Sequence, residues 1–391
     1  MAANLSILIV GAGVFGLSSA LELSRRGHSV TLIDPGPIPH PKAASTDISK
    51  AVRMDYGSDE LYMSLMEEAF QVWDQWNREW RTPLYHEDGF LLLSQEEIKP
   101  GGFEYESLQL LRKRGHTAER LNSESLRKRF PAWNAAKYPD GYFNPRAGWA
   151  ESGNVVEQLA QLAKTAGVSL RENLSAAGLI TNDHSVTGVV GSDGQRYSAD
   201  LVVLATGTWS PLLSQRLADV IRHVAQPIFY FRPKNVDLYR AKSFPVWAAD
   251  LSKTGWYGFP VTREGIVKVS NHGPGRNVHP DDDRQTAAND ETRCRTFLAE
   301  SLPHLAEAPL AGSRTCLYCD TWDGNFYIDR DPELSGLIYA TGGSGHAFKF
   351  TPVLGRLVAD VIEEKANPYN ARFAWRTRGT TAVKEQARFQ G

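Results

Sequence analysis

The strongest constraint on the fold lies at the start of the chain, where an apolar run meets a glycine-rich turn. Residues 5–10 are apolar and rich in β-branched side chains, which is typical of a buried parallel strand. The turn Gly11-Ala12-Gly13-Val14-Phe15-Gly16 follows directly, and residues 17–26 then carry apolar side chains at helical spacing. A second strand is expected at 29–33, and it ends at Asp34. The segment therefore predicts a strand, a tight turn, a helix and a second strand.

This order of elements is the setting in which a G-x-G-x-x-G turn binds a dinucleotide. Gly11 allows the tight turn, Gly13 lets backbone amides approach a pyrophosphate, and Gly16 lets the helix pack closely on the strand. The N-terminus of the helix adds partial positive charge. Asp34 lies close to the interval of about 20 residues expected for the carboxylate that binds a ribose hydroxyl. We therefore predict dinucleotide binding, although the turn alone fits both FAD and NAD.

Two later segments carry related signals. Residues 200–207 (Asp-Leu-Val-Val-Leu-Ala-Thr-Gly) are typical of a buried strand that ends in a small-residue turn, and residues 336–343 share this pattern. A helix is expected at 351–364, so the last segment repeats the strand–glycine–helix order of the first. Enzymes that bind only NAD usually hold it in one contiguous block. Nucleotide signals in the first, middle and last parts of the chain instead favour a large flavoprotein, so FAD is the predicted cofactor.

The predicted fold class is α/β (α+β), with a Rossmann-type FAD-binding domain interleaved with a mixed β-sheet substrate domain. Short strand-like runs between the nucleotide segments, such as 89–93 and 266–270, are expected to form a sheet that roofs the flavin. The tryptophans of a helix at 59–81 are expected in the core, and 277–291 is expected to be a surface loop. The predicted boundaries are 1–85, 145–220 and 326–391 for the FAD-binding domain, and 86–144 and 221–325 for the substrate domain.

Composition excludes several other classes. The 391 residues are 42% hydrophobic and 23% charged, which is ordinary for a globular protein. Basic and acidic residues nearly balance, 43 against 45, so no excess of charge points to nucleic acid. No apolar run reaches the roughly 18 residues that a membrane span needs. We expect a cytoplasmic monomer, and a peroxisomal location would require a signal other than the C-terminal Ser-Lys-Leu type.

The three cysteines leave four interpretations open. Cys294, Cys316 and Cys319 are too few for a disulfide scaffold, which favours a reducing compartment. A zinc site at Cys316 and Cys319 would need two further ligands, and Cys294 is the only other thiol, so no metal is expected. A thioredoxin-like redox pair would stand at the start of a helix, whereas this segment is strand-like. Ordinary buried cysteines are the third interpretation. The fourth comes from a family resemblance.

Residues 315–323 (Thr-Cys-Leu-Tyr-Cys-Asp-Thr-Trp-Asp) and 344–350 (Ser-Gly-His-Ala-Phe-Lys-Phe) carry that resemblance. Together they closely resemble the monomeric sarcosine oxidase, amadoriase (fructosyl amino acid oxidase) and pipecolate oxidase family of FAD-dependent amine oxidases, within the D-amino-acid-oxidase-like superfamily. Residues 10–17 and 256–260 occur in family order and spacing as well, so the resemblance covers most of the chain. It implies that a secondary amino acid is oxidised at its C–N bond to an imine that hydrolyses, while O₂ is reduced to H₂O₂.

The resemblance also implies roles for single residues. A cysteine at the position of Cys316 is joined to the flavin 8α carbon by a thioether, whereas Cys319 has no such role. Arg53 and Lys349 match carboxylate-binding positions, and Lys268 matches the lysine that activates O₂ beside the flavin. The candidate catalytic residues are Lys268, Lys50, His272 and Tyr257, and the candidate substrate-binding residues are Arg53, Lys349, Tyr318 and Arg376. The candidate FAD-binding residues are Gly11, Gly13, Val14, Phe15, Gly16, Asp34, Ser45, Thr46, Lys50, Cys316, Gly343, Ser344, Gly345, His346, Phe348 and Lys349.

Departures from the family pattern bear on the substrate. Asp47 with Lys50 is closer to the amadoriases than to the sarcosine oxidases, and residues 375–378 (Trp-Arg-Thr-Arg) resemble the amadoriase tail, in which an arginine helps to bind the substrate. Residues 256–260 and His272 lean toward the sarcosine and pipecolate branches. We therefore expect a fructosyl (glycated) or other N-substituted amino acid, with a sarcosine, pipecolate or saccharopine-type substrate as the alternative. A flavin dehydrogenase or desaturating amine oxidase of secondary metabolism, and a non-enzymatic flavin sensor, are further alternatives, and the pocket cations argue against the last.

Overall fold

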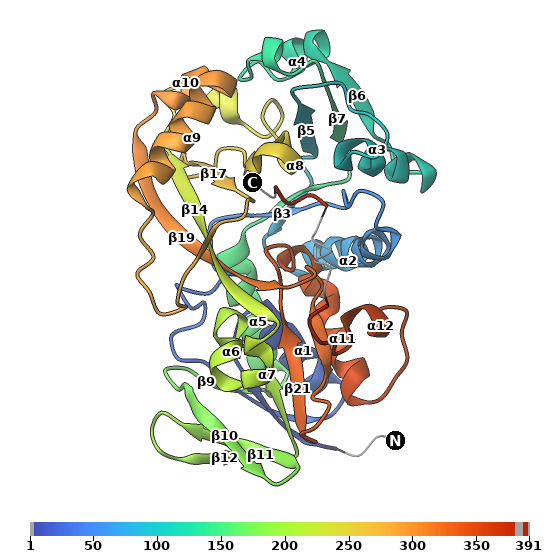
Figure 1. Ribbon diagram of the computed structural model, residues 1–391, viewed down its shortest axis with the longest axis vertical. Coiled ribbons are helices and arrows are strands. Elements are labelled where there is room, and N and C mark those ends of the chain that lie inside the picture. Colours follow the sequence, from blue (N-terminus) through green and yellow to red (C-terminus); the bar gives the residue numbers. More distant parts are fainter. Residues whose placement is uncertain (1–3, 380–385, 390–391) are drawn as a thin grey trace.

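The computed structural model describes residues 4–379 and 386–389, and its largest elements are two β-sheets stacked along the long axis (Figure 1). The six-stranded sheet has the order β20–β21–β13–β1–β2–β9, in which only β20 runs antiparallel to its neighbour. Its strands are β1 (Ser6–Val10), β2 (Ser29–Ile33), β9 (Ser169–Arg171), β13 (Leu201–Leu204), β20 (Tyr327–Arg330) and β21 (Leu337–Thr341).

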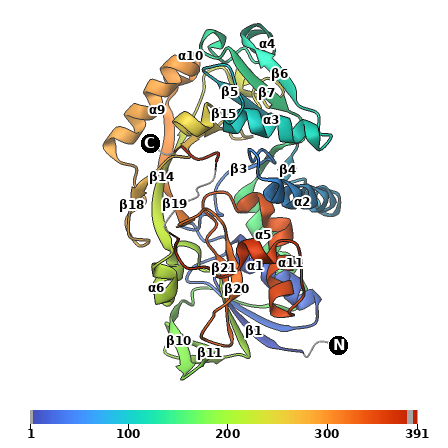
Figure 2. The same ribbon diagram turned by 45° about the vertical axis from the view of Figure 1, so that its right-hand side comes forward.

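The nine-stranded sheet is mixed, because β5 and β15 pair in parallel while the other neighbours are antiparallel. Its two longest strands, β14 and β19, extend from this sheet toward the six-stranded one in both ribbon views (Figure 1, Figure 2). The strands are β5 (Phe90–Ser94), β6 (Glu119–Asn122), β7 (Asp140–Asn144), β14 (Ile221–Phe231), β15 (Val246–Ala249), β16 (Trp256–Gly258), β17 (Val267–Asn271), β18 (Arg276–Asn277) and β19 (Leu310–Thr321).

Every strand of the six-stranded sheet falls within 1–85, 145–220 or 326–391, and every strand of the nine-stranded sheet falls within 86–144 or 221–325. The chain therefore crosses between the two sheets several times. The α/β fold with a parallel nucleotide-type sheet and a mixed sheet agrees with the predicted class. The exact domain boundaries stay a prediction.

The six-stranded sheet is covered on both faces, which explains its continuous apolar strands. Ile7 and Ile9 pack toward the layer formed by α1, α5 and α11, whereas the alternating residues Leu8 and Val10 pack toward the small sheet β10–β12. The bounds are α1 (Val14–Arg25), α5 (Ser152–Thr165), α11 (Thr351–Ile362), β10 (Ala176–Asn182), β11 (Ser185–Gly191) and β12 (Arg196–Ser198).

Helix α2 (Glu60–Glu79) begins where the Asp59 carboxylate accepts a hydrogen bond from the Tyr62 amide. Its tryptophans belong to the core, as predicted: Trp73 and Trp76 are buried, and neither lines a cavity of the site described below. The Trp73 indole donates to the Lys349 carbonyl oxygen at 2.8 Å. The helix thus fixes the backbone of a candidate substrate-binding residue.

The predicted loop at 277–291 is wrong at its end, because α9 (Ala288–Ser301) begins inside it. The acidic residues that indicated a loop form the first turn of this helix, where the Asp290 carboxylate accepts a hydrogen bond from the Ala287 amide. The remaining elements are β3 (Lys50–Val52), β4 (Tyr85–His86), β8 (Gly148–Ala150), α3 (Phe103–Lys113), α4 (Ser123–Arg129), α6 (Ser210–Leu213), α7 (Gln215–Ala218), α8 (Leu251–Thr254), α10 (Pro303–Ala306) and α12 (Asn370–Phe373). Within 4–379 and 386–389, no helix has the length and apolar character needed to cross a membrane.

Candidate active site

A cavity of about 180 Å³ lies at the carboxyl ends of β1, β2, β13 and β21, where open α/β sheets bind their ligands. Strand β19 reaches its other side with Cys316 and Tyr318. We call this space the nucleotide cavity. Its lining comprises Gly11, Gly13, Val14, Phe15, Asp34, Pro35, His40, Ala43, Ala44, Ser45, Lys50, Ala205, Thr206, Gly207, Thr208, Trp209, Cys316, Tyr318, Cys319, Gly342, Gly343, Gly345, Ala347 and Phe348.

The glycine turn forms a cradle that larger side chains would fill. Gly11 has a φ of +104°, and a Cβ there would lie 2.6 Å from the Ala205 carbonyl oxygen. A Cβ on Gly16 would lie 1.8 Å from the Gly11 carbonyl oxygen, so this glycine allows α1 to approach the turn. Asp34 accepts hydrogen bonds from the amides of Ala12 (2.8 Å) and Gly36 (3.1 Å), which fix its carboxylate at the edge of the cavity. This geometry fits the diphosphate and ribose of a dinucleotide.

A second cavity, of about 70 Å³, adjoins the first, and we call it the substrate cavity. The two cavities share lining residues, so they meet along a common wall. The shared residues are Lys50, Tyr318, Gly345 and Phe348. The substrate cavity is further lined by Ala51, Arg53, Phe90, Ala248, Leu251, Tyr257, Phe259, His272, His346 and Lys349.

Two cations of this cavity are held among aromatic rings. The Arg53 guanidinium lies 5.5 to 5.9 Å from the ring centroids of Tyr56, Phe90 and Phe103, and its Nη1 donates to the Asp55 carbonyl oxygen. The Lys349 ammonium donates to the Tyr56 hydroxyl (2.8 Å) and to the His346 carbonyl oxygen (2.9 Å). Both side chains are therefore fixed before any ligand enters, which suits recognition of a carboxylate.

Tyr257, His272 and Tyr318 form a polar group on the same cavity wall. The His272 Nδ1 lies 3.4 Å from the Tyr318 hydroxyl, and their rings are 5.6 Å apart. Burial, together with the negative charge that Tyr257 and Cys316 carry when ionised, raises the pKa of Tyr318 well above its ordinary value. Its hydroxyl therefore stays protonated at neutral pH and acts as a hydrogen-bond donor rather than as a base.

The two candidate catalytic lysines occupy different positions. Lys50 lines both cavities, whereas Lys268 lies behind the wall, 1% exposed, with its Nζ 2.7 Å from Asp47 Oδ2 and 2.5 Å from the Ser49 carbonyl oxygen. Burial lowers the pKa of Lys268 to about 8 against the opposing charge of Asp47, so the ammonium is still protonated at pH 7. Lys268 and Lys50 in turn hold the pKa of Asp47 far below its ordinary value despite its burial.

Comparison with known proteins decides the class of this site. The sequence profile of the family described as FAD dependent oxidoreductase (DAO) matches residues 6–361. The chain belongs to this family. FAD is accordingly the dinucleotide that the nucleotide cavity fits.

Individual relatives of this FAD-dependent oxidoreductase agree over nearly the full chain. It is 29% identical to L-saccharopine oxidase from Schizosaccharomyces pombe over 95% of this chain and 93% of the relative. It is 25% identical to a monomeric sarcosine oxidase from a Bacillus species, over 92% and 93% of the two chains. A crystal structure of the fructosamine oxidase Amadoriase II from Aspergillus fumigatus superposes with a TM-score of 0.86 at 27% identity, covering 99% of this chain and 94% of the other.

Most predicted FAD-binding residues line the nucleotide cavity of this oxidoreductase. They are Gly11, Gly13, Val14, Phe15, Asp34, Ser45, Lys50, Cys316, Gly343, Gly345 and Phe348. His346 and Lys349 line the substrate cavity instead. Gly16, Thr46 and Ser344 lie behind the wall; the Ser344 hydroxyl, for example, accepts from the Thr321 amide at 3.1 Å.

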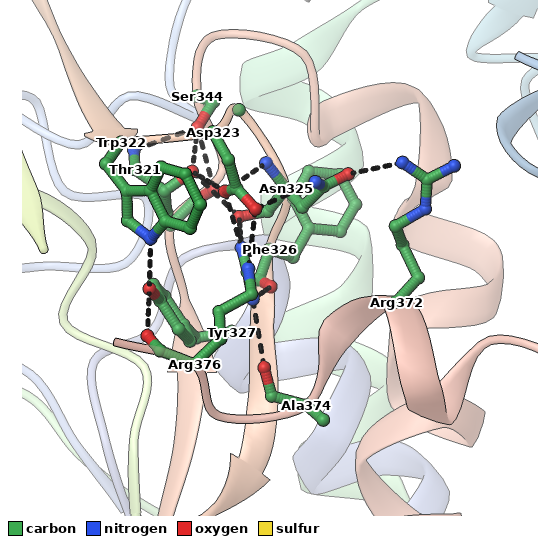
Figure 3. Close-up of polar contacts among 12 residues, drawn as sticks. Thr321, Trp322, Asp323, Asn325, Phe326, Tyr327, Ser344, Arg372, Ala374 and Arg376 are labelled. Carbon is green, nitrogen blue, oxygen red and sulfur yellow. Dashed lines mark hydrogen bonds and ion pairs between the residues drawn. The ribbon is translucent and has the colours of Figure 1, made fainter. Parts of the chain in front are cut away.

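The structure places Arg376 outside both cavities. Its guanidinium forms a two-pronged ion pair with Asp323 at 2.6 and 2.7 Å and donates to the carbonyl oxygens of Asn325, Phe326 and Ala374 (Figure 3). This network holds the segment after α12 against β20. The other predicted substrate-binding residues, Arg53, Lys349 and Tyr318, are brought together in the substrate cavity.

Several cavity residues were not predicted from the sequence. Residues 205–207 belong to the segment 200–207 that carried a predicted nucleotide signal, but neither they nor Thr208 and Trp209 were named as FAD-binding residues. Pro35, His40, Ala43 and Ala44 come from the irregular stretch after β2, and no local pattern marks them. Cys294 lies in α9 in the core under the nine-stranded sheet, and the three cysteines are unpaired thiols. Within 4–379 and 386–389, no cluster of three metal-ligating side chains occurs.

Proposed function

We propose that this enzyme oxidises the C–N bond of an N-substituted amino acid to an imine and passes the electrons to O₂, producing H₂O₂. Bound FAD would supply the hydride acceptor. The observation that carries the proposal is the common wall of the two cavities, which places a pair of fixed cations and three polar side chains next to the FAD site. The oxidases of saccharopine and sarcosine among the relatives support this reaction type.

Arg53 and Lys349 would bind the substrate carboxylate. Their surrounding rings and carbonyl oxygens keep both cations in one arrangement, so little side-chain entropy is lost on binding. A carboxylate held by both cations would direct the adjacent C–N bond toward the shared wall. We assign the carboxylate subsite to these two residues.

The amine would face His272, Tyr257 and Tyr318. A secondary amine is oxidised from its neutral form, so a group must take up its ammonium proton. The His272 imidazole is the base that the polar wall offers, while the Tyr318 hydroxyl already carries its proton at neutral pH and cannot take up another. Tyr318 would therefore orient the substrate nitrogen, and His272 would hold the proton.

Positive charge for the reaction of O₂ would come from Lys50 and Lys268. Negative charge develops on O₂ as it takes up electrons, and a fixed ammonium in a dry site stabilises that charge. Lys50 lines both cavities. Lys268 lies behind the wall in the ion pair with Asp47, with its Nζ 4.6 Å from the ring centroid of Phe259, a residue that lines the substrate cavity. This positive field favours an oxidase over a dehydrogenase that delivers electrons elsewhere.

The substrate cavity favours a compact, apolar N-substituent. Apart from its polar wall and cations, the cavity is lined by His346 and by apolar or small residues. The His346 ring nitrogens lie 3.0 Å from the Tyr56 hydroxyl and the Gly324 carbonyl oxygen, and the other lining residues are Ala51, Phe90, Ala248, Leu251, Phe259, Gly345 and Phe348. A fructosyl group would lose water from several hydroxyls against such a surface without replacement hydrogen bonds. Arg376, which favoured a fructosyl substrate, is bound elsewhere. We therefore favour other N-substituted amino acids, such as N-methyl or cyclic secondary amino acids, over glycated ones.

We further propose that FAD is joined to Cys316, whose side chain lines the nucleotide cavity. Two measurements on the purified enzyme test the proposals. Acid precipitation shows whether the flavin stays with the chain, and a Cys316→Ser variant should release it. Peroxide release is then measured with sarcosine, pipecolate, saccharopine and fructosyl amino acids. Flavin bleaching without peroxide under air would indicate a dehydrogenase, and no bleaching with any of these amines would refute the amine-oxidase reaction.

A further inference from the structure

The three buried cysteines of this chain have different surroundings. Burial raises the pKa of the Cys319 thiol to about 11, and it raises the pKa of Cys294 further still. Both are held as neutral thiols, and Cys319 donates to the Gly207 carbonyl oxygen at 3.1 Å. Cys316 is just as buried, at 2% exposed, yet its side chain lies among cations.

Arg314 is the first of these cations. It lies two residues before Cys316 on β19, so the two side chains leave the same face of the strand. Its Nη1 donates to the Thr46 carbonyl oxygen at 3.1 Å, which anchors the guanidinium on the segment before β3. Burial alone would lower the pKa of Arg314, but the negative charges of Cys316, when ionised, and of Asp47 raise it.

Arg284 approaches from the loop before α9. Its guanidinium lies 5.5 Å from the ring centroid of Trp209, a residue that lines the nucleotide cavity, and its Nη2 donates to the Pro280 carbonyl oxygen at 2.9 Å. Its Nε and Nη1 are buried and have no hydrogen-bond partner within 4–379 and 386–389. Cys316 provides the strongest stabilisation of its charge. Buried guanidinium donors that lack a hydrogen-bond acceptor are costly unless an anion forms beside them.

We propose that Arg284 and Arg314 activate the Cys316 sulfur for attachment to the flavin, by stabilising the negative charge that it carries as it attacks. The inference rests on the proposed covalent FAD. The negative charge on the Cys316 sulfur would be the partner that the buried Nε and Nη1 of Arg284 lack within the described part of the chain. The charged neighbours of Cys316, rather than its position in the sequence, distinguish it from the two inert thiols. Lys50, on the wall of the same cavity, adds a third positive charge.

Attachment needs no reactant other than the Cys316 thiol, the flavin and O₂. The thiol loses its proton, the flavin 8-methyl group loses another, and the sulfur electron pair forms the new C–S bond. The electron pair of the broken C–H bond stays on the ring, so the flavin is reduced by two electrons. O₂, which the proposed oxidase consumes in any case, takes up these two electrons and the two protons as H₂O₂. The arginines act on the first step only, because they stabilise charge on sulfur.

Thiol reactivity tests the inference without any flavin or turnover. The full chain is produced in riboflavin-starved cells and treated with iodoacetamide at pH 7, and peptide mass spectrometry reports alkylation of each cysteine. Cys316 should react at least about tenfold faster than Cys294 and Cys319, since a thiolate is the reacting form. Arg314→Met and Arg284→Met should each slow alkylation of Cys316 about tenfold, and Arg314→Lys should restore much of the rate. Arg295→Met is the matched control, because Arg295 is also partly buried and donates to the carbonyl oxygens of Ala306 and Ala308. It lies over Phe231, which pairs with Leu310 at the end of β19 away from Cys316.

FAD addition to the same flavin-free chains gives the second readout, as the fraction of flavin that precipitates with the protein in acid over time. The arginine variants should attach FAD about tenfold more slowly than the wild type and the Arg295→Met control. Wild-type Cys316 that alkylates no faster than the other cysteines overturns the inference even if the variants fold poorly. Equal attachment rates in all variants also overturn it, while leaving the tether intact. A wild type that releases all its FAD in acid refutes the tether itself, and the inference falls with it.

Discussion

Replacing Lys268 by methionine separates the two halves of the proposed reaction. The side chain lies outside the substrate cavity, so methionine leaves the carboxylate subsite and the polar wall unchanged. Reduction of the flavin by substrate without oxygen should therefore stay within about threefold of the wild-type rate. Reoxidation by O₂ should slow, because a buried positive charge is removed from behind Phe259 of the cavity wall.

The size of the effect follows from the burial of the pair. A fixed donor aimed at developing charge in a dry site contributes about 3–4 kcal/mol, so reoxidation should fall roughly 100- to 1000-fold. Within 4–379 and 386–389, the same substitution leaves the buried Asp47 carboxylate with the Tyr230 hydroxyl and the Ile48 amide as hydrogen-bond donors, each at 2.7 Å. The charges of Lys50 and Arg314 stabilise it from farther away. Breaking a buried ion pair by removing one partner costs about 3–5 kcal/mol of folding free energy.

A second substitution distinguishes these two consequences. Asp47→Asn combined with Lys268→Met removes both charges, so most of the lost folding free energy should return, as urea unfolding would show. Reoxidation measured by stopped flow should stay slow, because the ammonium itself is still missing. Lys50→Met should slow reoxidation similarly with little loss of stability, because Lys50 faces the cavities and has no ion-pair partner within 4–379 and 386–389.

Two outcomes would refute the reasoning. Equal losses in the reductive and oxidative halves would show that Lys268 supports the site as a whole rather than the oxygen reaction. A double variant that reoxidises at the wild-type rate would show that the single variant is slow only because an uncompensated Asp47 charge opposes electron transfer to oxygen. Either result would remove Lys268 from the proposed oxygen chemistry.

Four further predictions concern single groups. Because the pKa of Lys268 is about 8 and its protonated form is the active one, the reoxidation rate should fall as pH rises through about 8, measured by stopped flow from pH 6 to 10. Arg53→Ala should lower kcat/KM about 10- to 100-fold through loss of a charged hydrogen bond, with an unchanged flavin spectrum. Gly345→Ala, at a φ of +76° and with its Cβ 2.3 Å from the Tyr318 ring, should reduce FAD content, which absorbance ratios would show. Arg376→Ala should lower the unfolding midpoint by thermal denaturation while leaving KM within about twofold, and a large rise in KM would return it to the substrate site.

The sequence was most informative where a local pattern has one structural meaning. The run before Gly11, the spacing of the glycines and the acidic end of the second strand predicted the whole first unit, because a parallel strand, a tight turn and a helix N-terminus each require particular residue types. Because nucleotide signals occur in the first, middle and last parts of the chain, the sequence also predicted that segments of the two domains alternate along it. The limits of α9 were missed since acidic residues favour both loops and first helical turns.

The sequence could not predict how deeply Lys268 is buried. Alternation along β17 predicted that the Lys268 side chain points to the opposite face of the strand from Val267 and Val269. It did not predict whether that face meets solvent, a cavity or another charge. Its partner Asp47 lies 221 positions away in sequence. Only the pairing of β17 with β14 and the path of the segment before β3 bring the two together. The lysine of this strand and an aspartate of a distant polar segment therefore form one buried ion pair.

Arg376 shows that a motif can predict a substrate contact that the structure does not contain. This affects which substrates should be tested. The motif that contains it resembles a tail in which arginine meets the substrate, yet in this chain Asp323 lies within ion-pair distance of its guanidinium and a set of carbonyl oxygens occupies the remaining donors. A guanidinium with every donor engaged would have to break an ion pair before it could bind a sugar hydroxyl, and a neutral hydrogen bond does not offset that loss. The free energy available for substrate recognition therefore lies in the carboxylate subsite and the apolar wall, and screening should vary the N-substituent while keeping the α-carboxylate constant.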